Sequence, residues 1–332
     1  MEKNNNKYEF CSKQHFLYLK GIAIISVLIA HIGNYSGKTW FTPLGGIGVA
    51  IFLFCSGYGL MSSYSKKGVK SFWKNKLVSI YIPFAITEIV AAIVLKYSIT
   101  EIILDLLFVK CMNPLGWYMQ YLIACYFTFW LGAKYIHNKY IQKIVWCVIA
   151  VGSFWVFDNL RAEQAISFLS GIFFFEYYNL KKEKSNIKKL KRGGYHRTYF
   201  VRGCMLICLS IVLLAIKQTY FVRGLNHYII TLINLVMKTG CAVGCLLITE
   251  YIQPMRKITS WFGKMSYPLY LTHGYYMYFI SENVFGIYIT NSLMMILVSL
   301  LSASVLNRIK KVYMEKFISR GGEMDGTKGV SD

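Results

Sequence analysis

The sequence is poor in acidic residues, in proline and in flexible linkers. Only 15 of its 332 residues are Asp or Glu, against 37 Lys or Arg, and only five are Pro. No Gly/Ser-rich stretch divides the chain, so a tethered soluble domain is not expected. None of its nine Cys residues shows the C-x-x-C spacing typical of a metal site, and we expect no bound metal.

Apolar and aromatic residues are abundant instead. Hydrophobic residues make up 55% of the chain and aromatic residues 17%, whereas a soluble domain averages about 45–50% apolar residues even with Gly included. No small-x-small cleavage site follows the first apolar run, so we expect this run to remain as a signal anchor. The composition predicts an all-α, multi-pass membrane protein.

Short basic blocks separate the apolar runs and predict about ten transmembrane helices around a central cavity. We expect spans near residues 16–35, 43–64, 77–96, 115–135, 143–158, 164–180, 203–217, 226–250, 267–285 and 291–307. This arrangement places thirty of the 37 basic residues on one side and six on the other, so both termini are expected to be cytoplasmic. The same bias explains the net charge of +22 without a nucleic-acid partner.

Three regions follow from this topology. Residues 1–15 are a cytoplasmic segment, residues 16–310 the membrane domain, and residues 311–332 a polar, frayed cytoplasmic tail. Within the domain, Pro83 predicts a kink, and residues 97–114 predict an amphipathic segment at the outer face.

The first apolar run places a cation and an imidazole on one helix face. Lys20 and His31 are eleven positions apart, which is three turns plus about 20°, and about 16 Å along the axis. Lys74 and Lys76 would lie at the same inner face. Cations at a membrane entrance suit a phosphorylated metabolite, and a deeper neutral imidazole could take a proton from an alcohol. A coenzyme A ester has the matching shape. The simpler interpretations are that Lys20 only snorkels to the interface, that His31 is only hydrogen-bonded, and that Lys74 and Lys76 belong to a solvated loop.

Three further charges lie within predicted spans, namely Glu88, Glu176 and Lys238. Each is costly unless it is paired or hydrated. Structural ion pairs are one explanation, and a role in acceptor binding or proton relay is the other.

Five sequence blocks, taken in order, resemble the acyltransferase 3 family of integral membrane acyltransferases. The blocks are LKGIAIISVLIAH (residues 19–31), GGIGVAIFLFCSGY (45–58), FWKNKLVSIYIP (72–83), WYMQYLIACY (117–126) and GKMSYPLYLTH (263–273). The resemblance implies that His31 is the catalytic base and that Lys20, Lys74 and Lys76 hold the acyl-CoA. Lys20 stands where the family has Arg, and Ser79 where another Arg often appears, which implies a differently posed donor site.

Other residues of these blocks are candidates for lining the site. His273 belongs to the last block, where Ser266 and Tyr267 are expected to cap or orient the start of the helix. Packing alone is the competing explanation for His273 and for Ser56. The candidate lining residues are Ser56, Glu88, Tyr267 and His273.

The resemblance implies an O-acetyltransferase-like enzyme of the plasma membrane. It would move an acyl group, acetyl in the first instance, from cytoplasmic acyl-CoA to a hydroxyl of a cell-envelope glycan or lipid-linked sugar, without a permanently bound cofactor. Direct transfer and a covalent acyl-enzyme both fit. The alternatives are a glycan or lipid transporter, and a catalytically degenerate member that acts as a membrane partner.

Overall fold

The computed structural model describes residues 10–184, 194–249, 251 and 256–326. Within these ranges the chain forms helices and no strand, which confirms the predicted all-α class. Parts of the predicted terminal segments, residues 1–9 and 327–332, lie outside the described residues, as do residues 185–193 of the most basic loop. The chain divides into two compact units, residues 1–69 with 121–266 and residues 70–120 with 267–332.

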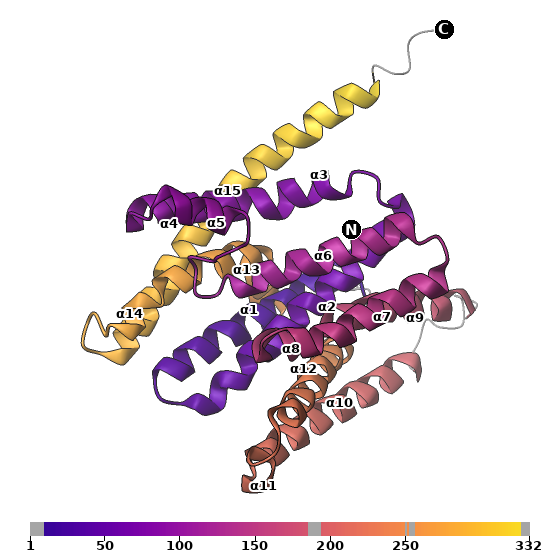
Figure 1. Cartoon of the computed structure of the whole chain (residues 1–332), viewed down its shortest axis with the longest axis horizontal. Coiled ribbons are helices and arrows are strands. Elements are labelled where there is room, and N and C mark those ends of the chain that lie inside the picture. The colour runs from indigo at the N-terminus through magenta and orange to yellow at the C-terminus, as the bar shows by residue number, and fades with distance from the viewer. Residues whose placement is uncertain (1–9, 185–193, 250, 252–255, 327–332) are drawn as a thin grey trace, which may run out of the picture. The chain divides into compact units, whose positions relative to one another are not determined.

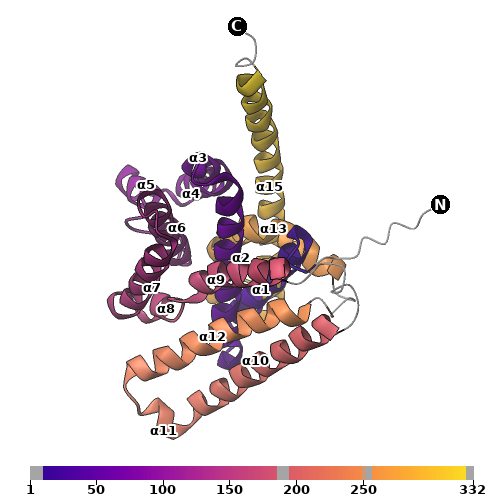
Figure 2. The same ribbon diagram turned by 90° about the vertical axis from the view of Figure 1, so that its right-hand side faces the viewer.

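The first unit contains the amino-terminal helices and most of the middle of the chain (Figure 1). Its elements are α1 (Lys13–Tyr35), η1 (Thr39–Phe41), α2 (Thr42–Lys67), most of α6 (Trp117–Tyr135), α7 (Lys139–Val156), α8 (Asn159–Ala162), α9 (Ser167–Lys184), α10 (Gly194–Gln218), α11 (Tyr220–Arg223), α12 (His227–Thr249) and the first half of α13 (Arg256–Tyr276). Figure 2 shows α10 and α12 side by side, with the short α11 between them.

Glycines allow the helices of this unit to pack closely. A Cβ atom on Gly48 of α2 would meet the Ala23 carbonyl of α1, and one on Gly263 of α13 would meet the Leu17 carbonyl. Small residues at such contacts are typical of helix packing in membranes. The first, second and last of the five sequence blocks therefore meet around α1.

The second unit contains the helices of residues 70–120 and 267–332. Its elements are α3 (Phe72–Lys76), η2 (Leu77–Tyr81), α4 (Ile82–Leu95), α5 (Ile99–Leu106), the start of α6, the second half of α13, α14 (Tyr278–Ser281) and α15 (Tyr288–Gly326). A π-helical turn at Leu77–Tyr81 comes just before Pro83, where the sequence predicts a kink. Proline lacks the N–H that a regular helix needs at this position, so the turn widens there.

Seven helical stretches among the described residues are long and apolar enough to cross a membrane. They are Lys13–Tyr35, Thr39–Lys67, Phe72–Leu95, Lys139–Val156, Arg197–Gln218, His227–Thr249 and Tyr288–Glu315. The expected spans near 115–135, 164–180 and 267–285 also form helices, α6, α9 and α13, but these are more polar. The chain is therefore a multi-pass membrane protein, and the count of ten stays a prediction.

Two expectations about helix ends are wrong. The helix expected at 267–285 is α13, which begins eleven residues earlier, at Arg256. Its polar first half lacks the apolar run that marks a span, because part of its surface packs on α1. The tail expected to fray from residue 311 continues as α15 to Gly326.

Candidate functional site

Helix α1 carries both members of the predicted pair. It runs without interruption from Lys13 to Tyr35, so Lys20 and His31 share one face, about 16 Å apart along the axis. Both side chains are half-buried. Within the described part of the chain, no carboxylate lies at ion-pair distance from Lys20. The ammonium group of Lys20 therefore has no counter-ion there that a ligand phosphate would have to displace.

Lys20 lies level with the middle of α2, where Cys55 and Ser56 are. The charge of Lys20 acts on the Cys55 thiol, and the side chain of Ser56 hydrogen-bonds with Tyr126 of α6. Because α1 and α2 are antiparallel, Ser56 lies at the Lys20 end of the pair, far along α1 from His31.

A second cation lies at this end of α1, and sequence reasoning missed it. Arg256 begins α13, and its charge acts on the side chain of Tyr18, two positions before Lys20. A Cβ atom on Gly21 would meet the Thr259 carbonyl, so the first turn of α13 packs directly on α1. The sequence marks Arg256 only as a basic residue of an inner loop, and the structure places it beside Tyr18, on a different side of α1 from Lys20.

A buried ion pair lies at the level of His31. The residue before His31 packs against Gly45 of α2, and the neighbouring Gly46 lies against the side chain of Lys238 on α12. The Lys238 ammonium pairs with the Glu163 carboxylate. Of the two explanations offered for the buried charge of Lys238, the structure supports a structural ion pair. Its partner is Glu163, which the sequence did not single out.

The other two intramembrane charges are also partnered. Glu176 pairs with Lys143 at 2.7 Å. Glu88 is buried and accepts a hydrogen bond from the Tyr275 hydroxyl, and the carboxyl of Asp105 interacts with it. Burial raises the pKa of Asp105. No third ligand joins them, since the described residues hold no group of three His, Cys, Asp or Glu suited to a metal ion.

The basic segment before α4 belongs to the second unit. Lys74 is exposed, and Lys76 is half-buried with its ammonium 5.8 Å from the centre of the Phe72 ring. The Ser79 hydroxyl donates to the Asn75 carbonyl at 2.7 Å. Lys20 and His31 belong to the first unit, so joint action of these lysines with them stays a prediction.

Tyr267 and His273 occupy positions in α13 that differ from those expected. Tyr267 lies in the middle of the helix, so neither it nor Ser266 caps the helix start; its hydroxyl donates to the Ile80 carbonyl at 2.7 Å. His273 is fully buried near the helix end, with Nδ1 2.9 Å from the Leu269 carbonyl. Because a carbonyl only accepts, Nδ1 carries a proton and donates it to the Leu269 carbonyl. This hydrogen bond fixes the orientation of the His273 ring.

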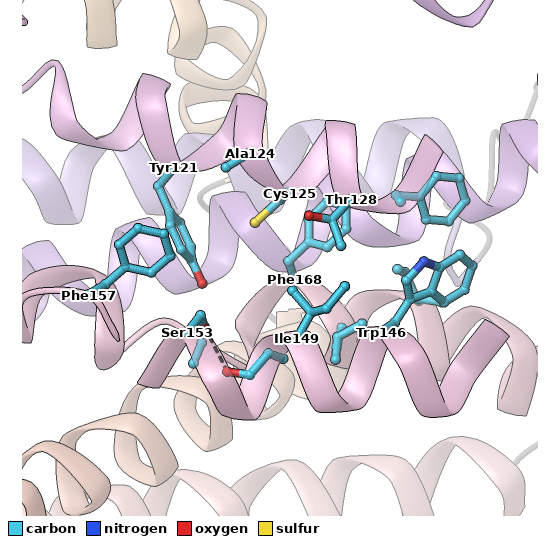
Figure 3. A pocket seen from close by; sticks show the side chains of 14 residues that line it. Tyr121, Ala124, Cys125, Thr128, Trp146, Ile149, Ser153, Phe157 and Phe168 are labelled. Carbon is cyan, nitrogen blue, oxygen red and sulfur yellow. Dashed lines mark hydrogen bonds between the residues drawn. The ribbon is translucent and has the colours of Figure 1, made fainter. Parts of the chain in front are cut away.

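Two pockets are lined by residues other than Lys20 and His31. The one in Figure 3 has a volume of about 70 Å³ and is lined by α6, α7 and α9, with the hydroxyl of Tyr121 pointing toward Ser153. It has room for water but is far below the ~300 Å³ of an ordinary ligand site. A cavity of about 440 Å³ in the second unit is lined mainly by apolar residues of α4, α13 and α15, with Tyr275 in its wall.

Comparison with known proteins agrees with the resemblance seen in the sequence. Residues 16–308 match the model of the acyltransferase 3 family, described as an acyltransferase domain. The acyltransferase MdmB of Streptomyces mycarofaciens is 25% identical over 166 residues, which are 41% of this chain and 43% of that relative. The aligned stretch thus spans less than half of the relative's length. No solved structure matches the chain.

Proposed function

Since the chain belongs to the acyltransferase 3 family, we propose that it moves an acyl group, acetyl in the first instance, from cytoplasmic acyl-CoA to a hydroxyl of a cell-envelope glycan or lipid-linked sugar. The observation that carries this proposal is the single uninterrupted helix with Lys20 near one end and His31 near the other. That separation of about 16 Å suits a donor whose phosphates and thioester lie at opposite ends of a long arm.

The proposed orientation puts both termini in the cytoplasm, with about ten spans around a cavity in the plasma membrane. The bias of thirty basic residues against six supports this orientation. It places Lys20 at the cytoplasmic mouth, where acyl-CoA is present, and His31 toward the outer half.

The donor phosphates would bind at the cytoplasmic mouth. Lys20 supplies one cation there, and Arg256 supplies another from α13. Arg256 offers the planar fork that Lys20 lacks, and this fork matches phosphate oxygens in pairs. We propose that Lys74 and Lys76 contribute further positive charge from the second unit.

The reaction would proceed by general base catalysis. Neutral His31 takes the proton of the acceptor hydroxyl while the hydroxyl oxygen attacks the thioester carbonyl. The C–S bond then breaks, and the coenzyme A thiolate leaves and takes up the proton from the imidazolium. Ser56, Glu88, Tyr267 and His273 are proposed as residues that line the site.

Transfer of label in membranes tests this function. Membranes of the native cell that contain the wild-type chain, or His31→Ala, are incubated with radiolabelled acetyl-CoA, and label in extracted glycans and lipids is counted. We expect His31→Ala to lose at least ~100-fold in rate, the usual share of a general base. His137→Ala, which changes an exposed histidine of the same unit, serves as the matched control and should keep full activity.

The rival functions give different results. A transporter predicts that export of the glycan or lipid survives His31→Ala and that acetyl-CoA does not bind. A degenerate family member predicts normal expression without acyl transfer to any membrane component. Either result would overturn the proposed function.

A further inference from the structure

A cluster of charged side chains lies in the first unit, on residues from the ends of α8, α10 and α11 and the middle of α12. We call Glu163, Lys217, Arg223 and Lys238 the cation cluster. Lys238 pairs with Glu163, and the charges of Glu163, Lys238 and Arg223 all act on the Lys217 ammonium. Three cations around one carboxylate leave an excess of positive charge, so the internal ion pair does not neutralise the cluster.

These cations lie where basic residues are otherwise scarce. In the proposed orientation only seven of the 37 basic residues fall outside the inner segments, and three of the seven belong to the cation cluster. The positive-inside rule accounts for the other thirty but not for this gathering. Charged side chains within a membrane domain are costly, and such a group indicates a ligand of opposite charge.

Asn234 adds a buried polar group to the cation cluster. Its side chain is 3% exposed, and its amide nitrogen donates to the Glu163 carboxylate. Across the described residues, its Oδ1 accepts no hydrogen bond. A buried acceptor without a donor is unfavourable, and a ligand hydroxyl would satisfy it.

An apolar groove of about 410 Å³ adjoins the cation cluster. It is lined by residues of α7, of the segment just before α9, and of α12; they include Trp155, Ile166, Tyr228 and Leu235. Ile166 follows Glu163 by three positions, and Leu235 precedes Lys238 by three, which places Leu235 and Lys238 on one face of α12. Helices α7 and α12 both qualify as spans, so in the proposed orientation an open groove between them would face hydrocarbon.

Aromatic side chains set the depth of the groove. The Trp155 and Tyr228 rings lie 4.9 Å apart at one end of it. Trp and Tyr gather at the boundary between hydrocarbon and headgroups, so the groove runs from the headgroup level into the membrane. Arg223 ends α11 four residues before α12 begins at His227, so this member of the cation cluster lies within reach of a lipid headgroup.

The cation cluster is also near the proposed base. Gly46 of α2 lies against Lys238, and the preceding Gly45 lies against the residue before His31. A molecule bound at the cation cluster would thus have its polar end at the level of the imidazole.

We propose that the cation cluster and the adjoining groove bind one anionic amphiphile, a lipid whose chain fills the groove and whose phosphate or carboxylate meets the cations. A hydroxyl of its head donates to Oδ1 of Asn234. Resting on the proposed function, this molecule is the acceptor, presented to His31 from the membrane. An ordinary anionic phospholipid has the same chemistry, and the experiments below separate the two sources.

Fluorescence of Trp155 reports occupancy of the groove directly. The purified full chain is placed in phosphatidylcholine vesicles that contain either brominated phosphatidylglycerol or brominated phosphatidylcholine, and the Trp155 signal is taken as the difference between wild type and Trp155→Phe. Bromine quenches an indole that it touches. We expect the anionic lipid to quench Trp155 more strongly; equal quenching by both lipids would overturn the proposal.

Neutralising Lys217, which is half-buried, and Arg223, which is exposed, should remove this preference. Lys217 and Arg223 lie at helix ends and leave the buried pair intact, so Lys217→Gln/Arg223→Gln should fold. We expect the preference for phosphatidylglycerol to fall about fivefold for each cation removed. Lys38→Gln removes an exposed cation of the same unit and should leave the preference unchanged. An unchanged preference in the double variant would contradict the site.

Competition in the transfer assay identifies the occupant. If the site holds the acceptor, phosphatidylglycerol added to wild-type membranes should inhibit transfer of label, and should do so less in Lys217→Gln/Arg223→Gln. Absence of inhibition would overturn the acceptor assignment. Absence of any transfer by wild type would instead overturn the proposed function, while the quenching result would still decide whether the lipid site exists.

Discussion

Single buried charges link the amino-acid sequence to the arrangement of the helices. Lys238 stands out in the sequence because an apolar stretch surrounds it, but its partner Glu163 lies in a short polar segment between two expected spans. The spacing of residues along the chain cannot predict an ion pair between two residues that are 75 positions apart. The requirement that a buried charge have a counter-charge predicts that a partner exists, and only the fold identifies it.

The Lys238–Glu163 pair gives a prediction about stability. Lys238→Met leaves the Glu163 carboxylate buried and unpaired, so we expect a loss of about 3–5 kcal/mol in the free energy of unfolding. Lys238→Met/Glu163→Gln removes both charges and should recover most of that loss. The melting temperatures of the purified variants in one detergent provide the measurement. Equal destabilisation by the single and double variants would show that the ion pair does not hold α12 to the start of α9.

At the scale of elements, glycines determine how closely the helices approach. Gly57 of α2 faces the Phe168 carbonyl of α9, and Gly171 of α9 faces the Phe54 carbonyl of α2. This reciprocal contact brings the two backbones together, as small residues do in membrane helix pairs. Helix packing therefore explains some of the glycines in the block at residues 45–58. The resemblance of this block to the acyltransferase 3 family does not by itself indicate a catalytic role for its residues.

Substitution of glycines on α2 tests this packing. Gly57→Ala places a methyl group against the Phe168 carbonyl and should destabilise the first unit by about 1–3 kcal/mol. Gly59→Ala lies two residues further on the same helix with no atom within 4 Å of the added Cβ, and should be neutral or stabilising by up to about 1 kcal/mol. Thermal unfolding of the two variants is the comparison; equal effects would contradict a close α2–α9 contact.

At the scale of the whole molecule, the sequence predicts best where hydrophobicity is continuous. The runs at residues 16–35, 43–64 and 226–250 became α1, α2 and α12 with ends displaced by at most three residues. The start of α13 was not predictable in this way, because its first half is polar and is stabilised by contact with α1. The continuation of α15 beyond residue 311 was likewise not predictable, because that part of the sequence has no apolar pattern.

The candidate site was predictable in one part and not in another. Helical periodicity alone places Lys20 and His31 on one face, since both belong to the same run. The position of Arg256 beside Tyr18, and that of Lys238 at the level of His31, depend on contacts between distant segments. Lys74 and Lys76 belong to the second compact unit, so the sequence pattern alone still supports their role.

The most direct test of the central claim separates donor binding from proton removal. Binding of radiolabelled acetyl-CoA and the rate of acetyl transfer are measured on the same preparations of wild type, Lys20→Met and His31→Asn. We predict that Lys20→Met weakens acetyl-CoA binding about tenfold or more, the usual worth of a hydrogen bond to a charged group. His31→Asn should bind acetyl-CoA like wild type and transfer at least ~100-fold more slowly. Wild-type binding by Lys20→Met, or wild-type transfer by His31→Asn, would contradict the account.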